Sequence, residues 1–360
     1  MRVSFNSLKC LFSKTQTIVF NCRKLSSSLS EHAANSTEFL SEPSSNQKLL
    51  KVAIIGLPNA GKSTFINKLM DRKVFATSQR VHTTRVKAKA IFSSEDTQII
   101  FVDTPGLVNE REQKKFKLTP QFINDGREVA KHADIIGVIH DVSCHWTKDR
   151  LDIKIVRILE SNKEKPSFLV LNKVDDIKSK RKLLDITRNV TENSLDGKPI
   201  EHVKRNYKKE DNEYKGWAYF SDIFMVSALT GDGMDDVRNY LVSKAKPGQW
   251  LFPEAVWTDQ NTESVIINTV KAALLNFMPQ EVPYKLQPII EYLNVDEGGK
   301  IVTVVIVKCP TQRISKLLLG HSEGRLRNIT EYVQRELQEC FYSFVKIKIV
   351  PHPLPDETSQ

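Results

Sequence analysis

The chain has 360 residues, of which 40% are hydrophobic and 27% charged, a composition typical of globular proteins with about two domains. No apolar run approaches the roughly 18 residues needed to cross a bilayer, which disfavours a membrane-transport protein. The net charge is +10, but half of it lies in the first 30 residues, so overall charge does not indicate a nucleic-acid-binding protein. The five cysteines form no C-x-x-C pair, which disfavours a zinc site.

The N-terminal segment has an unusual charge pattern. It contains five basic residues and no acidic residue before Glu31. This basic, Ser-rich composition is typical of a mitochondrial transit peptide, and the alternative is a cytosolic tail without fixed structure. Residues 26–48 are rich in Ser, Asn and Glu, which indicates a cleavage region and a linker. We therefore expect residues 1–48 to be transit peptide and linker, with folded structure beginning near Leu49.

Residues 49–246 alternate strand-like apolar runs with helix-like segments, which predicts an α/β domain with a mostly parallel sheet. Residues 176–222 separate two of these strands by more than a usual connection. We interpret them as an insertion whose polar half, 196–216, lies at the surface and is largely flexible. The predicted strands are 51–55, 98–102, 134–139, 168–171 and 223–226.

A linker with two prolines and two tryptophans is predicted at 247–261, and a second, α+β domain at 262–350. Glu297-Gly298-Gly299 is a hairpin-turn signal between its first two strands. Residues 351–360 are predicted to be a tail without core residues. The expected elements are helix 262–276, strands 285–294 and 300–307, helices 313–319 and 326–340, and strand 344–350.

Residues 56–63 fit the phosphate-loop pattern G-x-x-x-x-G-K-S, between a predicted strand and an apolar helical pattern. The glycines let backbone N–H groups curl around phosphates, and the start of a helix favours negative charge. We expect Lys62 to reach the β- and γ-phosphates and Ser63 to bind Mg²⁺. The candidate phosphate-binding residues are Gly56, Pro58, Asn59, Ala60, Gly61, Lys62, Ser63, Thr64 and Gly106.

Asp103-Thr104-Pro105-Gly106 ends the next predicted strand. Alone, this tetrad would indicate a turn, but after a phosphate loop it predicts that Asp103 holds Mg²⁺ through water and that the Gly106 N–H meets the γ-phosphate. Between the two motifs lies His82-Thr83-Thr84-Arg85. One of its threonines can close over Mg²⁺ while the γ-phosphate is present, although an ordinary polar loop is the alternative.

A guanine-reading motif completes the pattern. Asn172-Lys173-Val174-Asp175 follows a predicted strand, and the Asp175 carboxylate can accept two hydrogen bonds from guanine, while Asn172 and Lys173 brace the base and the phosphate loop. Ser227 and Ala228 follow the last strand, where the Ala228 N–H can meet the guanine carbonyl. The sequence therefore predicts a GTPase that binds GTP and GDP with Mg²⁺.

In their order and in their residues, these motifs resemble those of the Era GTPases, most closely the mitochondrial branch, over about residues 49–350. The resemblance implies a C-terminal type II KH domain that binds single-stranded RNA, and a role in assembling the small mitochondrial ribosomal subunit through its rRNA in the matrix. It also implies Thr84 as a Mg²⁺ ligand and allows a potassium ion beside Asn59. We also consider the inner membrane as a partner that the protein contacts peripherally, and we predict no transmembrane segment.

One departure concerns the G-x-x-G loop that grips RNA in this family. The run Gly320-His321-Ser322-Glu323-Gly324 places Glu323 where the second glycine belongs. Either the loop is shifted by one residue to use Gly324, or RNA contact is weakened. Gly320, Gly324, Arg325 and Arg327 remain the candidate RNA-binding residues. The alternative function is a GTPase that docks a protein partner through a degenerate KH domain.

The second departure concerns hydrolysis. Leu107 stands where Ras-like enzymes place a water-orienting glutamine, and its side chain cannot form a hydrogen bond. The catalytic residue is therefore unknown. We expect slow hydrolysis until the backbone, a potassium ion near Asn59 or the ribosomal particle positions the water. The alternative is that a side chain within 80–90 or 107–115 holds it.

Overall fold

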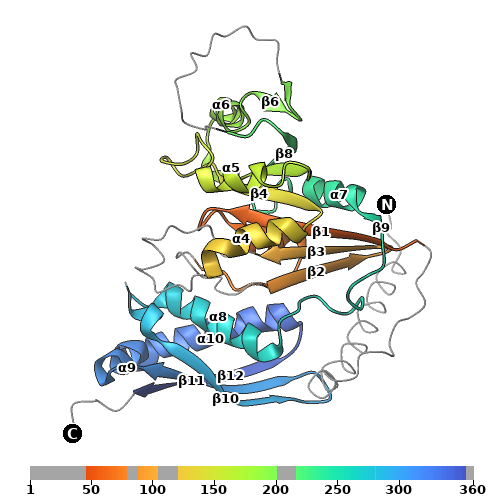
Figure 1. Cartoon of the computed structure of the whole chain (residues 1–360). Coiled ribbons are helices and arrows are strands. Elements are labelled where there is room, and N and C mark those ends of the chain that lie inside the picture. Colours follow the sequence, from red (N-terminus) through yellow and green to blue (C-terminus); the bar gives the residue numbers. More distant parts are fainter. Residues whose placement is uncertain (1–45, 79–87, 104–120, 201–215, 280, 354–360) are drawn as a thin grey trace, which may run out of the picture.

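The computed structural model describes residues 46–78, 88–103, 121–200, 216–279 and 281–353. Two bodies follow one another along the chain, a larger α/β unit and a smaller α+β unit (Figure 1). Among the described residues, no helix combines the length and the apolar character that crossing a bilayer requires.

The larger unit is built on a seven-stranded sheet with the order β2-β3-β1-β4-β5-β8 and with β9 paired to β1. All neighbours along that order are parallel except β2, which is antiparallel to β3. The predicted mostly parallel sheet is therefore confirmed. Its strands are β1 (Lys48–Gly56), β2 (Ala88–Ser94), β3 (Thr97–Asp103), β4 (Ile135–Asp141), β5 (Ser167–Asn172), β8 (Phe220–Val226) and β9 (Lys246–Pro247).

Helices cover both faces of this sheet because successive strand residues point to opposite sides. Ile54 packs in a core with α2 and α7, and its neighbour Ile55 packs in a second core with α4, α5 and α6. Parallel strands buried on both faces need continuous apolar runs, which explains why the sequence revealed them. The helices are α2 (Lys62–Leu69), α4 (Gln121–His132), α5 (Ile153–Glu160), α6 (Lys180–Val190) and α7 (Met234–Lys244).

Much of the predicted insertion at 176–222 belongs to the core. Helix α6 buries Leu183, Ile186 and Val190 against the sheet, and Trp217 joins the same cluster with 6% of its surface exposed. A Cβ at Gly216 would lie 2.4 Å from the Val190 carbonyl oxygen, so the backbone passes too close for any other residue. A short hairpin, β6 (Ser194–Leu195) and β7 (Lys198–Pro199), follows α6, and residues 201–215 lie outside the described residues.

The predicted linker at 247–261 runs along the sheet edge in fixed contacts. Gln98 is fully buried, and its amide donates to the Phe252 carbonyl at 2.8 Å. Its oxygen accepts from the backbone N–H groups of Leu251 at 3.0 Å and Phe252 at 3.1 Å. Further along, Thr258 forms a bridge with Ala90 of β2. The segment therefore fixes the path between the units.

The smaller unit is a three-stranded sheet, ordered β10-β11-β12, with three helices packed on one face. β10 is antiparallel and β12 parallel to the central β11. β12 continues to Pro353, so the predicted tail from 351 begins too early; prolines are tolerated there because β12 is an edge strand. The elements are α8 (Thr262–Phe277), β10 (Gln287–Val295), β11 (Ile301–Cys309), α9 (Gln312–Leu319), α10 (Gly324–Phe341) and β12 (Val345–Pro353).

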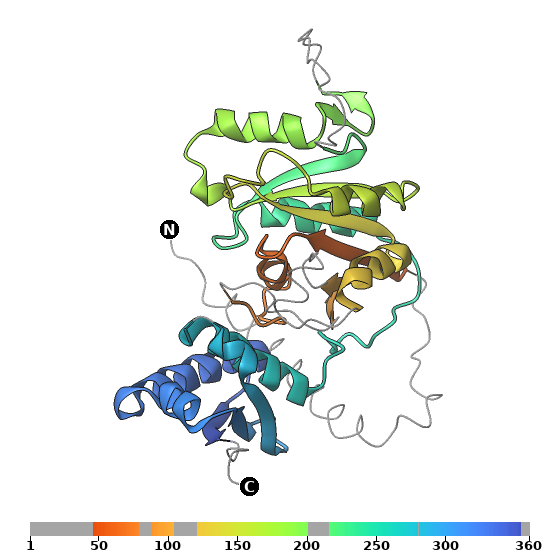
Figure 2. The same cartoon turned by 60° about the vertical axis from the view of Figure 1, so that its left-hand side comes forward.

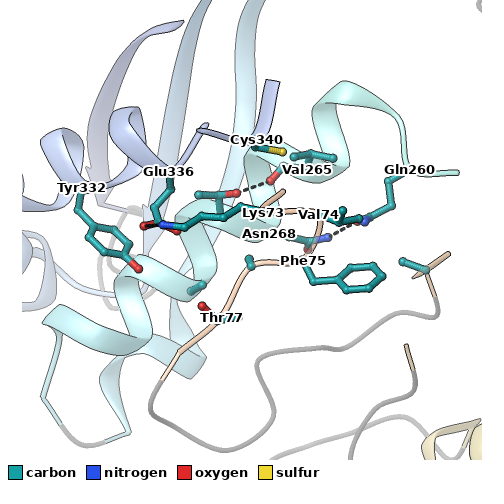
Figure 3. Close-up of a pocket in the computed structure, with 14 residues that line it drawn as sticks. Lys73, Val74, Phe75, Thr77, Gln260, Val265, Asn268, Tyr332, Glu336 and Cys340 are labelled. Carbon is teal, nitrogen blue, oxygen red and sulfur yellow. Dashed lines mark hydrogen bonds and ion pairs between the residues drawn. The ribbon is translucent and has the colours of Figure 1, made fainter. Parts of the chain in front are cut away.

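The turn at residues 71–73, directly after α2, joins the two units. Lys73 places its ammonium 2.5 Å from Glu336 of α10 (Figure 3). The same ammonium lies 2.9 Å from Glu339, also on α10. Figure 2 shows the segment after α2, in orange, reaching the helices of the smaller unit. A small cavity of about 40 Å³ lies beside this contact and is lined by Lys73, Tyr332 and Glu336 among others.

The neighbours of Lys73 in the 71–73 turn, Asp71 and Arg72, also contact other parts of the chain. The Arg72 guanidinium lies 4.9 Å from the ring centre of Trp257 and 4.3 Å from that of Tyr342. The Tyr342 hydroxyl donates to the Asp71 carbonyl at 2.6 Å. Arg238 of α7 lies 2.8 Å from the Asp71 carboxylate. The turn therefore contacts α7, the 247–261 segment and the C-terminal end of α10.

Candidate nucleotide site

The phosphate loop connects β1 to α2 at the carboxyl edge of the sheet. Gly61 has φ 93°, which only glycine adopts readily, and a Cβ there would lie 2.3 Å from the Asn172 side-chain nitrogen. A Cβ at Gly56 would lie 2.5 Å from the Ile139 carbonyl oxygen. Both positions must therefore be glycine, which leaves a backbone cradle of the kind that holds phosphate.

Lys62, at the first position of α2, lies across this loop. Its Nζ donates to the carbonyl oxygens of Gly56 at 3.2 Å and Leu57 at 3.0 Å, and only 7% of the residue is exposed. Burial lowers the pKa of Lys62 to about 8, although the nearby Asp103 carboxylate opposes the shift. The ammonium is thus held among carbonyl dipoles where an anionic phosphate would stabilise its charge.

Ser63 and Asp103 come together from different elements. Ser63 is the second residue of α2, Asp103 ends β3, and the serine hydroxyl donates to the Asp103 carboxylate at 2.8 Å. Asp103 is fully buried. Hydroxyl and carboxylate oxygens are the donors that Mg²⁺ prefers, so this pair fits that ion. Thr84, Gly106 and Leu107 lie outside the described residues.

Asn172 joins the phosphate loop to the predicted guanine-reading loops. Its Nδ2 donates to the Ala60 carbonyl at 2.8 Å. Its Oδ1 accepts from the backbone N–H of Ala228 at 3.0 Å and that of Lys173 at 2.8 Å. The residue is 2% exposed, and its bonds with Ala60 and Ala228 are buried. The structure therefore brings the three motifs, separated in sequence, to one place.

The remaining guanine-motif residues lie around Asn172. Asp175 is exposed in the short 3₁₀ helix Val174–Asp176, where its carboxylate is accessible to a base. Ser227 is fully buried, and its hydroxyl oxygen accepts from the Thr230 N–H at 3.2 Å, which shapes the loop that presents Ala228.

Sequence reasoning missed Asp141, at the end of β4. Its carboxylate lies 2.5 Å from the Lys173 ammonium. Burial raises the pKa of Asp141, but its bonds with Lys173 and Ser143 outweigh this and bring the pKa below its usual value. A signal was present, because a polar residue ends each of the parallel strands β3, β4 and β5 at the same sheet edge.

The α9–α10 loop of the smaller unit has a defined backbone. Gly320 has φ 72° and Glu323 has φ 59°, whereas Gly324 is helical with φ −63°. Glu323 therefore precedes α10 in a left-handed conformation, and Gly324 is the first residue of the helix. The Arg325 guanidinium donates to the Leu317 carbonyl, and Arg327 is exposed.

The chain was compared with known proteins. A family model described as 50S ribosome-binding GTPase matches residues 51–173. The chain is 34% identical over 348 residues to the mitochondrial GTPase Era of Salmo salar, with 84% of this chain and 76% of the relative covered. The chain belongs to the Era family of GTPases. Its identity to the mitochondrial GTPase Era of Danio rerio is 35% over 335 residues, covering 84% and 75% of the two chains.

Solved Era structures share this fold. A crystal structure of Era with MgGDPNP and nucleotides 1506–1542 of 16S ribosomal RNA superposes with a TM-score of 0.67 at 23% identity, covering 86% of this chain and 95% of that one. An Aquifex aeolicus Era variant bound to GDP and aluminium fluoride gives a TM-score of 0.66 at 23% identity, with the same coverage. The Era fold accounts for both units, a P-loop GTPase domain and a KH domain. This Era-family chain is accordingly an enzyme that converts GTP to GDP and phosphate.

Proposed function

We propose that this GTPase assembles the small mitochondrial ribosomal subunit by binding its rRNA under the control of GTP. The observation that carries the proposal is that one chain joins the nucleotide site to the KH domain through the fixed contacts of the 71–73 turn. The names of the relatives support a mitochondrial setting, and the neighbouring Era structure was solved with small-subunit rRNA.

In the nucleotide site, we assign Lys62 to the β- and γ-phosphates and Asp175 to guanine. Ser63 and Asp103 would hold Mg²⁺, together with Thr84. The ion would neutralise charge on the phosphates. The Gly106 N–H would meet the γ-phosphate, so that its loop distinguishes GTP from GDP. The hydrogen bond between Ser63 and Asp103 supports this assignment, because it places two oxygen donors side by side.

Hydrolysis should be slow without a partner, because Leu107 cannot orient water. A stimulation of about 10³-fold corresponds to roughly 4 kcal/mol of barrier, which a potassium ion near Asn59 or the ribosomal particle would supply. Single-turnover hydrolysis should be measured in sodium and in potassium, with and without small-subunit particles. Fast hydrolysis in sodium alone would contradict the proposal.

RNA binding is assigned to the α9–α10 loop. Its exposed Arg327 is the sharpest probe, because Arg325 also caps α9 and its loss would disturb the fold. Arg327→Glu should reduce crosslinking to rRNA at least about tenfold, as expected for a reversed phosphate contact. Arg335→Glu, exposed further along α10, is the matched control and should have a smaller effect.

A second candidate function is docking of a protein partner by a KH domain without RNA affinity. The identity of Glu323 favours this alternative, because it puts a carboxylate where alignment with the family expects the second loop glycine. Crosslinking of the GTP-loaded full chain to small-subunit rRNA separates the two. Complete absence of a crosslink would overturn the RNA proposal and favour protein docking.

The leader, 1–48, is proposed to direct the protein to the mitochondrial matrix, where it would meet the assembling subunit, with peripheral contact to the inner membrane. Its five basic residues and lack of acidic ones before Glu31 support this proposal. A reporter fused to residues 1–50 should enter mitochondria. A diffuse cytosolic signal would count against the assignment.

A further inference from the structure

We infer that Asp141 is a positioning residue for guanine-nucleotide binding, which acts by fixing Lys173 of the guanine-reading motif before the nucleotide arrives. The inference rests on the guanine-binding role proposed above for the motif at 172–175. It adds a residue from the end of β4 to a site otherwise built by the phosphate loop after β1, Asp103 at the end of β3, and the loops after β5 and β8.

Both oxygens of the Asp141 carboxylate have defined partners. Oδ2 binds the Lys173 ammonium at 2.5 Å. Oδ1 accepts from the Ser143 backbone N–H at 2.9 Å and from the Ser143 hydroxyl at 2.7 Å. The Asp141 side chain is 17% exposed. Ser143 therefore sets the orientation of the carboxylate, and the carboxylate sets the position of the ammonium.

The backbones of the two partners are also held together. Asp141 and Asn172 are register partners at the ends of β4 and β5, and the Val142 N–H donates to the Asn172 carbonyl at 3.1 Å. Lys173 then adopts a left-handed conformation with φ 67°, which a residue other than glycine keeps only when its surroundings enforce it. The Asp141 carboxylate and the Asn172 side chain supply that enforcement at the two ends of the lysine.

The consequence for binding is preorganisation. A free lysine side chain has large rotamer freedom, and a ligand that needs it in one place must remove that freedom on binding. Asp141 removes it in advance. Because Lys173 belongs to the guanine-reading motif rather than to the γ-phosphate contacts, GTP and GDP should benefit equally.

The test is Asp141→Asn, which keeps an oxygen for Ser143 and removes the charge that holds Lys173. The Kd values of GDP and of a non-hydrolysable GTP analogue should both rise about tenfold, through faster dissociation, while the single-turnover rate at saturation stays unchanged. Asp141→Glu should restore part of the affinity. Asp149→Asn, at an exposed position in the same loop, is the matched control and should have no effect.

A double-mutant cycle with Lys173→Ala shows whether Asp141 acts through the lysine. Asp141→Asn should add little in the Lys173→Ala background, whereas a merely structural role would lower affinity equally in both backgrounds. Three results would overturn the inference. They are an equal loss of affinity in both backgrounds, an unchanged affinity in Asp141→Asn, and a loss of affinity confined to the GTP analogue. Failure of the proposed motif assignment looks different, because Asp175→Asn would then leave guanine preference unchanged.

Discussion

The Lys73 ammonium lies 2.5 Å from the Glu336 carboxylate, although the two residues are 263 positions apart in the chain. Burial lowers the pKa of Lys73, but Glu336 and Glu339 outweigh it and raise the pKa above its usual value. Glu336 is more enclosed than Lys73, with side-chain exposures of 12% and 38%. The pair thus links the end of the phosphate-loop helix to the KH domain.

Reversing the charge of Lys73 should weaken the contact between the 71–73 turn and α10. Lys73→Glu places a third carboxylate beside Glu336 and Glu339, so the melting temperature should fall by a few degrees, equivalent to about 1 kcal/mol for a half-exposed contact. The double variant Lys73→Glu/Glu336→Lys should recover part of the loss. Lys131→Glu, which disrupts an exposed pair within α4, serves as control in the same thermal scan. Equal melting temperatures for all variants would show that the pair contributes nothing.

Removing the Asn172 side chain should damage both folding and binding. Asn172→Ala leaves the Ala60 carbonyl and the Ala228 N–H buried without their present partner. At about 1–3 kcal/mol for each of these two unsatisfied groups, the free energy of unfolding should fall by roughly 2–6 kcal/mol. Urea titration measures this loss, and GDP binding should weaken in parallel. A change in unfolding free energy below about 0.5 kcal/mol would mean that these bonds do not hold the loops together.

Changing Asp175 should alter specificity without altering stability, because the residue is exposed. Asp175→Asn reverses the hydrogen-bond pattern offered to the base, which then suits xanthine. Preference should move from GTP toward xanthosine triphosphate by at least about 100-fold, since a site built to hydrogen-bond one group strongly rejects its mismatch. Competition binding measures the ratio. Wild-type protein that bound ATP as tightly as GTP would contradict guanine recognition altogether.

Nucleotide affinity should depend on pH through Lys62, whose pKa burial lowers to about 8. Phosphate favours the charged lysine, so binding takes up a proton above pH 8, and affinity should fall by up to tenfold per pH unit from there. The nucleotide-free protein should respond oppositely. The unfolded chain holds this proton up to the usual lysine range, so stability rises with pH above 8. Calorimetry in two buffers detects the proton, and Lys62→Arg should remove the pH dependence.

The sequence predicted the buried parallel strands closely because strands covered on both faces carry continuous apolar runs. It missed β2, whose AKAIFSS sequence contains alanine, lysine and serine and becomes a strand through antiparallel pairing with β3. It also placed the tail boundary at 351, because Pro351 and Pro353 mark turns in most contexts but lie here on an edge strand. Tertiary pairing decided both cases.

The motifs at 56–63, 103 and 172–175 were predicted to form one nucleotide site from their order along the chain and because each stands at the end of a predicted strand. The structure places Ala60, Asn172 and Ala228 in direct contact. Asp141 escaped prediction, because its role depends on β4 lying beside β5. The backbone of the α9–α10 loop also needed coordinates, since nothing in the sequence indicates that Glu323 is left-handed while Gly324 is helical.

Helix α10 connects the 71–73 turn to the α9–α10 loop, so a movement at the turn is transmitted along the helix to the loop. It has 18 residues and begins at the α9–α10 loop, while its other end contacts the 71–73 turn through Glu336, Glu339 and Tyr342. At 1.5 Å per residue the helix is a stiff arm of about 27 Å. A tilt of about 5° at the turn would therefore swing the loop by about 2 Å along an arm of that length. A small tilt at the turn, which breaks no contact there, would therefore move the loop by a distance comparable to the length of a hydrogen bond.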